Sequence, residues 1–192
     1  IRIMSSEGNH GFGYACNFGV KVAQYDLIFF LSSDGWISRI DRSFKDDMAR
    51  VSKNCGAIQT HAVIADGSNA HRSLAKMTYL KLLASTLCLG TPIRRIQRVF
   101  PIHRILRFLP GSIGEYFTSY DDVSPLEKWS RCHTVGGGNM LIFKNAFDSV
   151  EGFDEGFFLY DDDIDLSLRL SAKRFENWWY SGIYVEMFVS AT

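Results

Sequence analysis

The order of apolar and polar segments predicts an α/β protein with a mixed, mostly parallel sheet flanked by helices. Over the first 67 residues, apolar runs of strand length that end in turn sequences alternate with helical patterns. A second block with the same alternation occupies residues 133–189. Strands joined through helices usually pair in parallel, and ligands bind beyond the carboxyl ends of such strands. Residues that directly follow a strand are therefore candidates for a functional site.

Length and composition favour one domain over residues 1–192. The chain is 46% hydrophobic, which is enough for a sizeable core, and its 21 basic and 21 acidic residues cancel, which argues against a nucleic-acid partner. The four cysteines include no Cys-x-x-Cys pair, so we expect reduced thiols in a cytoplasmic protein. No apolar run is long enough to span a membrane. Because the chain begins at Ile1 inside a strand-like segment, we expect it to lack N-terminal strands.

Apolar periodicity and turn residues predict the elements of the first part of the chain. The run LIFFL at 27–31 indicates a buried strand, and the turn sequence Ser-Ser-Asp-Gly closes it, so Asp34 stands at a strand end. The other expected elements are a strand at 1–4, a glycine-rich loop at 5–13, helices at 14–24 and 41–53, and a strand at 56–67.

Residues 72–130 have a different character, and we expect a variable helical region that covers the rest of the domain. Within this region, residues 93–109 carry five arginines among aliphatic and aromatic residues. Two interpretations stay open for this basic amphipathic segment. It is either a cover helix with its arginines in solvent, or a contact with a membrane surface or an anionic, lipid-linked substrate.

Alternating elements return near the end of the chain. Leu166, Leu168 and Leu170 are expected to face partly inward from a helix that opens with an acidic stretch. The expected elements here are a glycine loop running into a strand at 133–143, helices at 144–150 and 163–173, and a strand at 178–189.

Four carboxylates fall within five positions at the start of the second of these helices: Asp161, Asp162, Asp163 and Asp165. Acidic residues in the first turn complement the helix dipole, but this explains one or two of the four, because each added carboxylate raises the repulsion. A calcium-binding EF-hand loop needs glycine at its sixth position and glutamate at its twelfth, where this chain has Leu166 and Ala172.

Other motifs are also absent from the sequence. A dinucleotide-binding fingerprint fails because Cys16 stands where a third glycine is required after Gly11 and Gly13. The P-loop, nucleophile-elbow and HExxH patterns do not occur. What remains is a divided site, with Asp34 at a strand end and the acid cluster far along the chain. A divalent cation bound to one or two carboxylates and a substrate phosphate, with another carboxylate as general base, suits transfer from a phosphate-activated donor.

Two segments resemble family-2 glycosyltransferases of the GT-A fold, in particular the rhamnosyltransferase-like branch. The first, NHGFGYACNFGVKVAQYDLIFFLSSD at 9–34, is similar to the family's Asn-x-Gly-Phe-Gly-x-Ala-x-Asn-x-Gly stretch and the strand after it. The second, at 135–170, is similar to the family's Gly-Ala-x-Met-Leu-Ile, Gly-Phe-Asp-Glu-x-Phe-Phe and Glu-Asp-x-Asp blocks, in the same order and at the same spacing.

The resemblance implies an inverting transfer of a sugar from a nucleotide-diphosphate sugar to a hydroxyl of a glycan or lipid-linked acceptor, with Mg²⁺ or Mn²⁺. By position, Asp34 binds the metal and the diphosphate, and Asp163 is the general base. Asp162 replaces the family's Glu and either binds the acceptor or orients Asp163, while Asp165 supports the helix start. The remaining implied donor-binding residues are Asn9, Gly11, Asn17, Ser32, Gly137 and Gly138. For Asn9, Gly11 and Asn17, simple turn chemistry is the alternative.

The sequence departs from the family pattern at several positions. The Asp-x-Asp motif is reduced to Ser-Ser-Asp, with Ser32 in place of an acid or amide. Where many members have a metal-binding histidine, this chain has Glu186 as the nearest oxygen ligand. Two alternatives to the active enzyme therefore remain. One is a non-catalytic relative that binds a nucleotide or a glycan, or an inactive fragment of such an enzyme, and the other is a membrane-surface module that uses residues 93–109.

Overall fold

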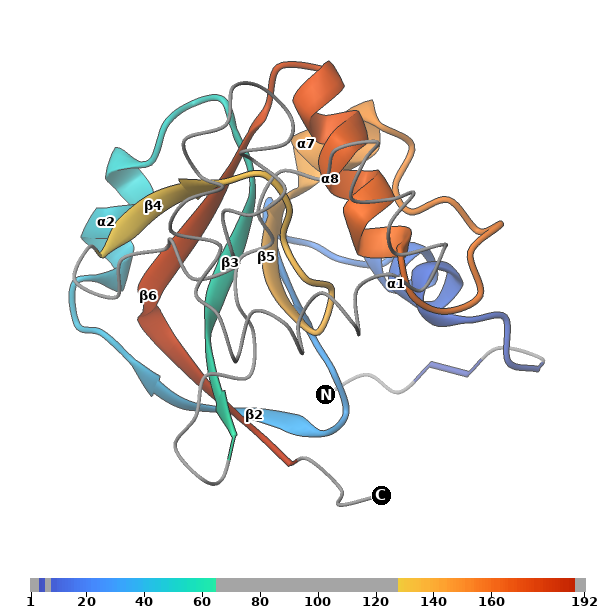
Figure 1. The fold of residues 1–192 in the computed structure, drawn as a ribbon, viewed down its shortest axis with the longest axis horizontal. Helices are drawn as coiled ribbons and strands as arrows, with labels where there is room; N and C mark the ends of the chain where they lie inside the picture. Colours follow the sequence, from blue (N-terminus) through green and yellow to red (C-terminus); the bar gives the residue numbers. More distant parts are fainter. Residues whose placement is uncertain (1–3, 6–7, 65–127, 189–192) are drawn as a thin grey trace, which may run out of the picture.

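The computed structural model describes residues 4–5, 8–64 and 128–188 (Figure 1). The cover region predicted over 72–130, except its last three residues, and nearly all of the strand predicted at 1–4 lie outside the described residues, as does the basic segment 93–109. The described elements are, in chain order, α1 (Phe12–Val20), β1 (Leu27–Leu31), β2 (Gly35–Ile40), α2 (Phe44–Arg50), β3 (Cys55–Ile64), β4 (Trp129–Cys132), β5 (Asn139–Phe143), α7 (Lys144–Ser149), α8 (Asp162–Ala172) and β6 (Glu176–Met187).

The strands form one mixed sheet in the order β1-β5-β3-β6-β2, with β4 also paired to β6. The α/β class is confirmed, but the expectation of a mostly parallel sheet is wrong for the described strands. Only β3 and β6 run parallel, and the other four pairings are antiparallel. Part of the difference comes from the topology. Strand β5, from the second half of the chain, inserts between β1 and β3 and runs antiparallel to both. The order of elements along the sequence does not say which strands pair.

Helices cover both faces of the sheet (Figure 1). Residues alternate between the two faces along a strand, so Met140 and Ile142 of β5 pack in one core cluster and Leu141 packs in the other. The first cluster includes side chains of α1, α7 and α8, among them Leu166 and Leu170. The second is covered by α2. The core therefore fixes α1 and α8 on the same face of the sheet.

Most predicted elements are present with shifted ends. The strand at 27–31 has the predicted bounds, whereas the first helix begins and ends earlier than predicted, at Phe12 and Val20. Leu168 is 49% exposed and does not face the core, because it lies two positions from Leu166 and Leu170 and so points to another side of the helix. Strands β2 and β4 were not predicted. In β2 most residues are exposed, so its sequence lacks a buried apolar run.

Candidate active site

Three consecutive glycines, Gly136–Gly138, connect three separate parts of the fold. The N–H of Gly136 donates a hydrogen bond to Oε1 of Gln59 on β3. The N–H of Gly137 donates to Oδ2 of Asp163 on α8, at 2.9 Å. The carbonyl of Gly138 accepts a bond of 2.8 Å from the N–H of Ser32, directly after β1. The glycine loop therefore brings the predicted metal-side turn and the predicted base to one region.

Gly137 is a glycine for reasons of packing. A Cβ at this buried position would lie 2.8 Å from Cε1 of Phe12 on α1 and 3.6 Å from the Cβ of Asp163. The missing side chain makes room for the aromatic ring, so the loop, α1 and α8 approach one another closely. The donor-binding role that the family resemblance implies for Gly137 stays a prediction.

Asp34 lies in the turn that joins β1 to β2, as the pattern at the strand end predicted. Its carboxylate is exposed, and Oδ1 accepts a hydrogen bond of 2.5 Å from the hydroxyl of Ser32. The carbonyl of Asp34 accepts a bond of 2.8 Å from the N–H of Phe188, just beyond β6. The turn is thus held from the Ser32 side and from the end of β6, and the Asp34 residue is exposed.

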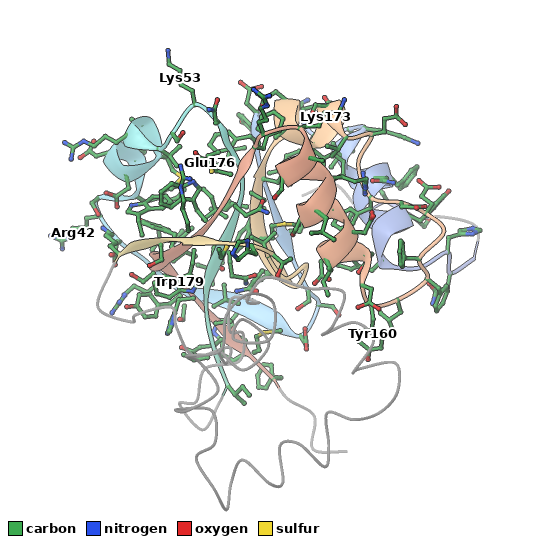
Figure 2. The ribbon with its side chains drawn as sticks, turned by 45° about the horizontal axis from the view of Figure 1, so that its top comes forward. Arg42, Lys53, Tyr160, Lys173, Glu176 and Trp179 are labelled. Carbon is green, nitrogen blue, oxygen red and sulfur yellow. The ribbon has the colours of Figure 1, made fainter. Side chains whose placement is uncertain are left out.

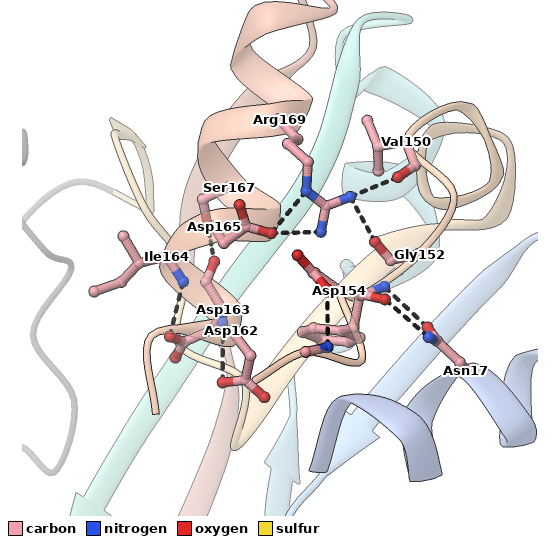
Figure 3. A network of polar contacts seen from close by, with 12 residues as sticks. Asn17, Val150, Gly152, Asp154, Asp162, Asp163, Ile164, Asp165, Ser167 and Arg169 are labelled. Carbon is pink, nitrogen blue, oxygen red and sulfur yellow. Dashed lines mark hydrogen bonds and ion pairs between the residues drawn. The ribbon is translucent and has the colours of Figure 1, made fainter. Parts of the chain in front are cut away.

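Asp163 is partly buried in the first turn of α8, where two backbone N–H groups orient its carboxylate; Figure 3 shows the one from Ile164. Oδ2 accepts from Gly137 at 2.9 Å, and Oδ1 accepts from Ile164 at 2.8 Å. Each carboxylate oxygen can accept more than one hydrogen bond. Asp163 therefore keeps the capacity to accept a further hydrogen bond, with its carboxylate held in one orientation.

Asp162 is the most deeply buried of the four acids, with 4% of its surface exposed. Its Oδ1 accepts the N–H of Asp163 at 3.0 Å, whereas Oδ2 has no hydrogen-bond partner within the described parts of the chain. Burial, followed by the neighbouring charge of Asp163, raises the pKa of the Asp162 carboxyl. On α1, burial and the charge of Asp162 raise the pKa of Cys16 to about 12, so this thiol stays uncharged.

Asp165 supports the helix start, as expected. Its Oδ2 lies 2.7 Å from Nε of Arg169, one helical turn later. Nη1 of the same arginine donates to the carbonyls of Val150 and Gly152 (Figure 3). Asp165 and Arg169 therefore tie the first turn of α8 to the loop after α7, and this carboxylate is committed to the fold.

Asn9, in the glycine-rich loop before α1, and Asn17, within α1, also serve the fold. Oδ1 of Asn9 accepts the N–H of Gly11 at 3.1 Å, which is local turn chemistry. Asn17 exchanges two bonds of 2.9 Å with the backbone of Phe153, and its Nδ2 also donates to Glu155. Asn17 thus fastens α1 to the loop that precedes the acid cluster, and donor contacts for these residues stay predictions.

A buried polar network beneath the glycine loop was missed from the sequence. Nε2 of Gln59 donates to Oδ1 of Asn139 at 2.6 Å, and Nδ2 of Asn139 donates to the carbonyl of Thr60 at 2.9 Å. All three residues are at most 1% exposed. The available signal was the presence of amides inside the apolar strand sequences AIQTHAV and NMLIF, because buried polar groups need partners.

The residues present fit a divalent cation only in part. Among the described residues, no three His, Cys, Asp or Glu side chains come together as a metal site. Glu186, the suggested substitute ligand, is paired with Trp36 across the β2–β6 ladder and is partly buried. Asp34 therefore offers one carboxylate, which suffices for a cation whose other ligands are phosphate oxygens and water.

Comparisons with known proteins agree with the fold. No family model matches the chain. O-antigen biosynthesis protein RfbC of Myxococcus xanthus is 22% identical over 176 residues, covering 90% of this chain and 12% of that protein. Rhamnosyltransferase WbbL of Escherichia coli (strain K12) is 54% identical over 35 residues, covering 18% of this chain and 13% of that protein. The chain thus spans about an eighth of the length of the curated relatives it matches.

The comparison with solved structures gives the type of fold. A crystal structure of GalNAc-T7 with UDP, GalNAc and Mn²⁺ superposes with a TM-score of 0.58 at 9% identity, over 96% of this chain and 31% of that chain. The structure has the GT-A type of glycosyltransferase fold, as the sequence predicted. The chain is, more particularly, a sequence relative of proteins named for O-antigen biosynthesis and rhamnosyl transfer, and the resemblance to glycosyltransferases is confirmed. No helix in the part of the chain that the structure describes is long and apolar enough to cross a membrane.

Proposed function

We propose that the chain is a glycosyltransferase domain that moves a sugar, with inversion, from a nucleotide-diphosphate sugar to a hydroxyl of a glycan or lipid-linked acceptor. The observation that carries the proposal is the glycine loop. Gly138 bonds the backbone of Ser32 beside Asp34, and Gly137 bonds the carboxylate of Asp163. These two contacts support a single site that includes both acids, although they are far apart in the sequence, with Asp34 on the donor side and Asp163 on the acceptor side.

On the acceptor side, Asp163 acts as general base. The acceptor oxygen attacks the anomeric carbon, the bond from that carbon to the phosphate oxygen breaks, and the nucleotide diphosphate leaves with the electron pair. The hydroxyl proton passes to the Asp163 carboxylate, which its two backbone bonds hold in one orientation. Asp162 orients this group, since its Oδ1 accepts the N–H of Asp163.

On the donor side, Asp34 holds the diphosphate with Mg²⁺ or Mn²⁺. A bound divalent cation would offset the negative charge that the leaving diphosphate gains. The neighbouring Ser32 hydroxyl fixes the Asp34 carboxylate, so one oxygen keeps its orientation in the absence of ligand. The Mn²⁺ and UDP in the GalNAc-T7 structure support a divalent cation here without identifying the sugar or the nucleotide of this chain.

Turnover tests the role of Asp163 directly. Nucleotide-diphosphate release from a panel of UDP- and dTDP-sugars is expected with wild type and is expected to fall at least about a hundredfold in Asp163→Asn, as is typical for loss of a general base. Asp46→Asn is the matched control, because Asp46 is an exposed acid on α2, which covers the opposite face of the sheet from α8. Equal turnover in wild type and Asp163→Asn would remove Asp163 as the base.

A non-catalytic relative that binds a nucleotide or a glycan is the second candidate. It is favoured by the serine at position 32, where family members carry a further acid or amide. The hydroxyl of Ser32 also donates a hydrogen bond to one carboxylate oxygen of Asp34. Nucleotide binding without sugar release from any donor of the panel would favour this candidate. A cytoplasmic location and a membrane contact through residues 93–109 stay predictions.

A further inference from the structure

We propose that Phe158, Leu159 and Tyr160 form a platform on which a pyranose ring of the acceptor saccharide packs. This inference rests on the proposed function and deepens it, because it assigns the acceptor side of that site. The three side chains are consecutive, large and apolar or aromatic, and they are 58%, 55% and 76% exposed. A run of exposed side chains of this kind marks an interaction surface more often than it serves the fold.

The backbone beneath the platform is held in one position. The carbonyl of Phe158 accepts a hydrogen bond of 3.3 Å from the N–H of Phe12. Gly11 makes this approach possible, because a Cβ there would lie 2.3 Å from the same carbonyl oxygen. Because α1 is packed in the core, the loop that carries the platform is anchored to a rigid element of the fold.

Backbone strain marks the same segment. Tyr160 and Asp161 have φ angles of 67° and 65°, in the left-handed region that non-glycine residues rarely adopt. Strained residues of this kind concentrate at ligand clamps and active sites. The strained turn sets Tyr160 outside the sheet, directly before α8 (Figure 2).

The chemistry around the platform selects a saccharide as its occupant. A pyranose ring has an apolar C–H face and a rim of hydroxyl groups. The platform offers aromatic faces, and the exposed Asp161 and partly exposed Asp163 beside it accept hydroxyl hydrogen bonds. A hydrocarbon chain on the same surface would remove water from these carboxylates without giving them partners, which is costly.

The position of the platform assigns it to the acceptor. Tyr160 is three residues from Asp163, the group proposed to take the acceptor proton. On the donor side, Asp34 is joined through its carbonyl to Phe188, whose ring lies 4.5 Å from that of Trp36. A sugar on the platform would therefore lie beside the proposed base. The aromatic residues on the donor side are Trp36 and Phe188.

Saturation-transfer NMR on the full chain tests the proposal, with methyl α-L-rhamnopyranoside, methyl β-D-galactopyranoside and methyl N-acetyl-β-D-glucosaminide as probes. We expect transfer to the ring C–H protons of at least one glycoside. Tyr160→Ser is expected to reduce this signal at least about fivefold, as loss of one aromatic contact of roughly 1 kcal/mol predicts. Tyr160→Phe keeps the ring and is expected to keep the signal.

Tyr25 provides the matched control, because it is 79% exposed and lies before β1, at the other end of that strand from Asp34. Tyr25→Ser is expected to leave the signal unchanged. No transfer to any probe, or equal transfer with wild type and Tyr160→Ser, overturns the proposal. Sedimentation of the wild type with phosphatidylcholine–phosphatidylglycerol vesicles, if lost in Tyr160→Ser, would identify a lipid surface as the ligand of the platform. This result would also overturn the proposal.

The measurement contains neither nucleotide nor metal, so it separates the platform from the proposed transfer reaction. Glycoside binding that depends on Tyr160, together with absent donor turnover, would support the platform and contradict the proposed transferase activity. Donor turnover that depends on Asp163, with no effect of Tyr160→Ser on glycoside binding, would support the proposed transferase activity and contradict the platform.

Discussion

The backbone N–H of Gly137 lies 2.9 Å from Oδ2 of Asp163 and donates a hydrogen bond to it. The orientation of the proposed base is therefore set by a loop from a distant part of the sequence. In the same loop, the carbonyl of Gly138 accepts a hydrogen bond from the N–H of Ser32, and the N–H of Gly136 donates one to Gln59. Changes in this loop should alter stability and the geometry of the site together.

Gly137→Ala is expected to destabilise the fold by about 1–3 kcal/mol, because the new methyl group overlaps the ring of Phe12 and the buried site has little room to relax. Gly19→Ala is the matched control. A Cβ at Gly19, inside α1, meets nothing within 4 Å, and alanine there is expected to stabilise by about 0.5–1 kcal/mol. Urea denaturation measures both effects, and equal stabilities of the two variants would contradict the packing role of Gly137.

Gln59→Leu is expected to leave the Gly136 N–H without its side-chain acceptor, at a cost of about 1–3 kcal/mol. Because Gly136 precedes the residue that bonds Asp163, hydrogen exchange at the Gly136 and Gly137 amides is expected to accelerate. Gln24→Leu, at an exposed position before β1, serves as the control. Unchanged exchange at both glycine amides in Gln59→Leu would show that the buried amide does not hold the loop.

Asp162→Asn is expected to stabilise the protein near neutral pH. Burial raises the pKa of Asp162, so the folded state binds this proton more tightly than the unfolded state does. Its stabilising contribution is present below the unfolded value of 3.8 and is lost as pH rises through the higher folded pKa. A neutral amide removes the cost of the buried charge at neutral pH. Urea denaturation at neutral and acidic pH checks the sign, and a larger loss of stability at neutral pH than at acidic pH would contradict it.

Asp47→Asn is expected to act in the opposite direction. Hydrogen bonds from Lys128, Tyr180 and Ser43 lower the pKa of Asp47 to about 2. The stability from this carboxylate is present above the unfolded value of 3.8 and is lost as pH falls toward 2. The variant is expected to lose about 2 kcal/mol at neutral pH, as is usual for hydrogen bonds to a charged group, and less in acid. Asp46→Asn, on an exposed neighbour in α2, is the control in the same denaturation series.

Local patterns predicted the features that depend on neighbouring residues. The apolar run before Asp34 predicted β1 and its end, and the acid cluster with the following leucines predicted the helix α8. Features that depend on distant contacts could not be predicted. Three features join residues that are far apart in the chain. They are the insertion of β5 between β1 and β3, the exposed edge strand β2, and the hydrogen bond that the Gly136 N–H donates to Gln59. Asn17 shows the same limit, because its two hydrogen bonds with the backbone of Phe153 join residues that are far apart in the chain.

Calorimetric titration with UDP and dTDP, with and without Mn²⁺, tests most directly whether Asp34 marks the donor side of a sugar-transfer site. The account predicts metal-dependent binding of at least one nucleotide to wild type and to Asp163→Asn. It predicts affinity at least about tenfold weaker, or 1.4 kcal/mol, in Asp34→Ala. Binding that is independent of metal, equal affinity in Asp34→Ala, or no binding to wild type would contradict the assignment of Asp34 to the donor.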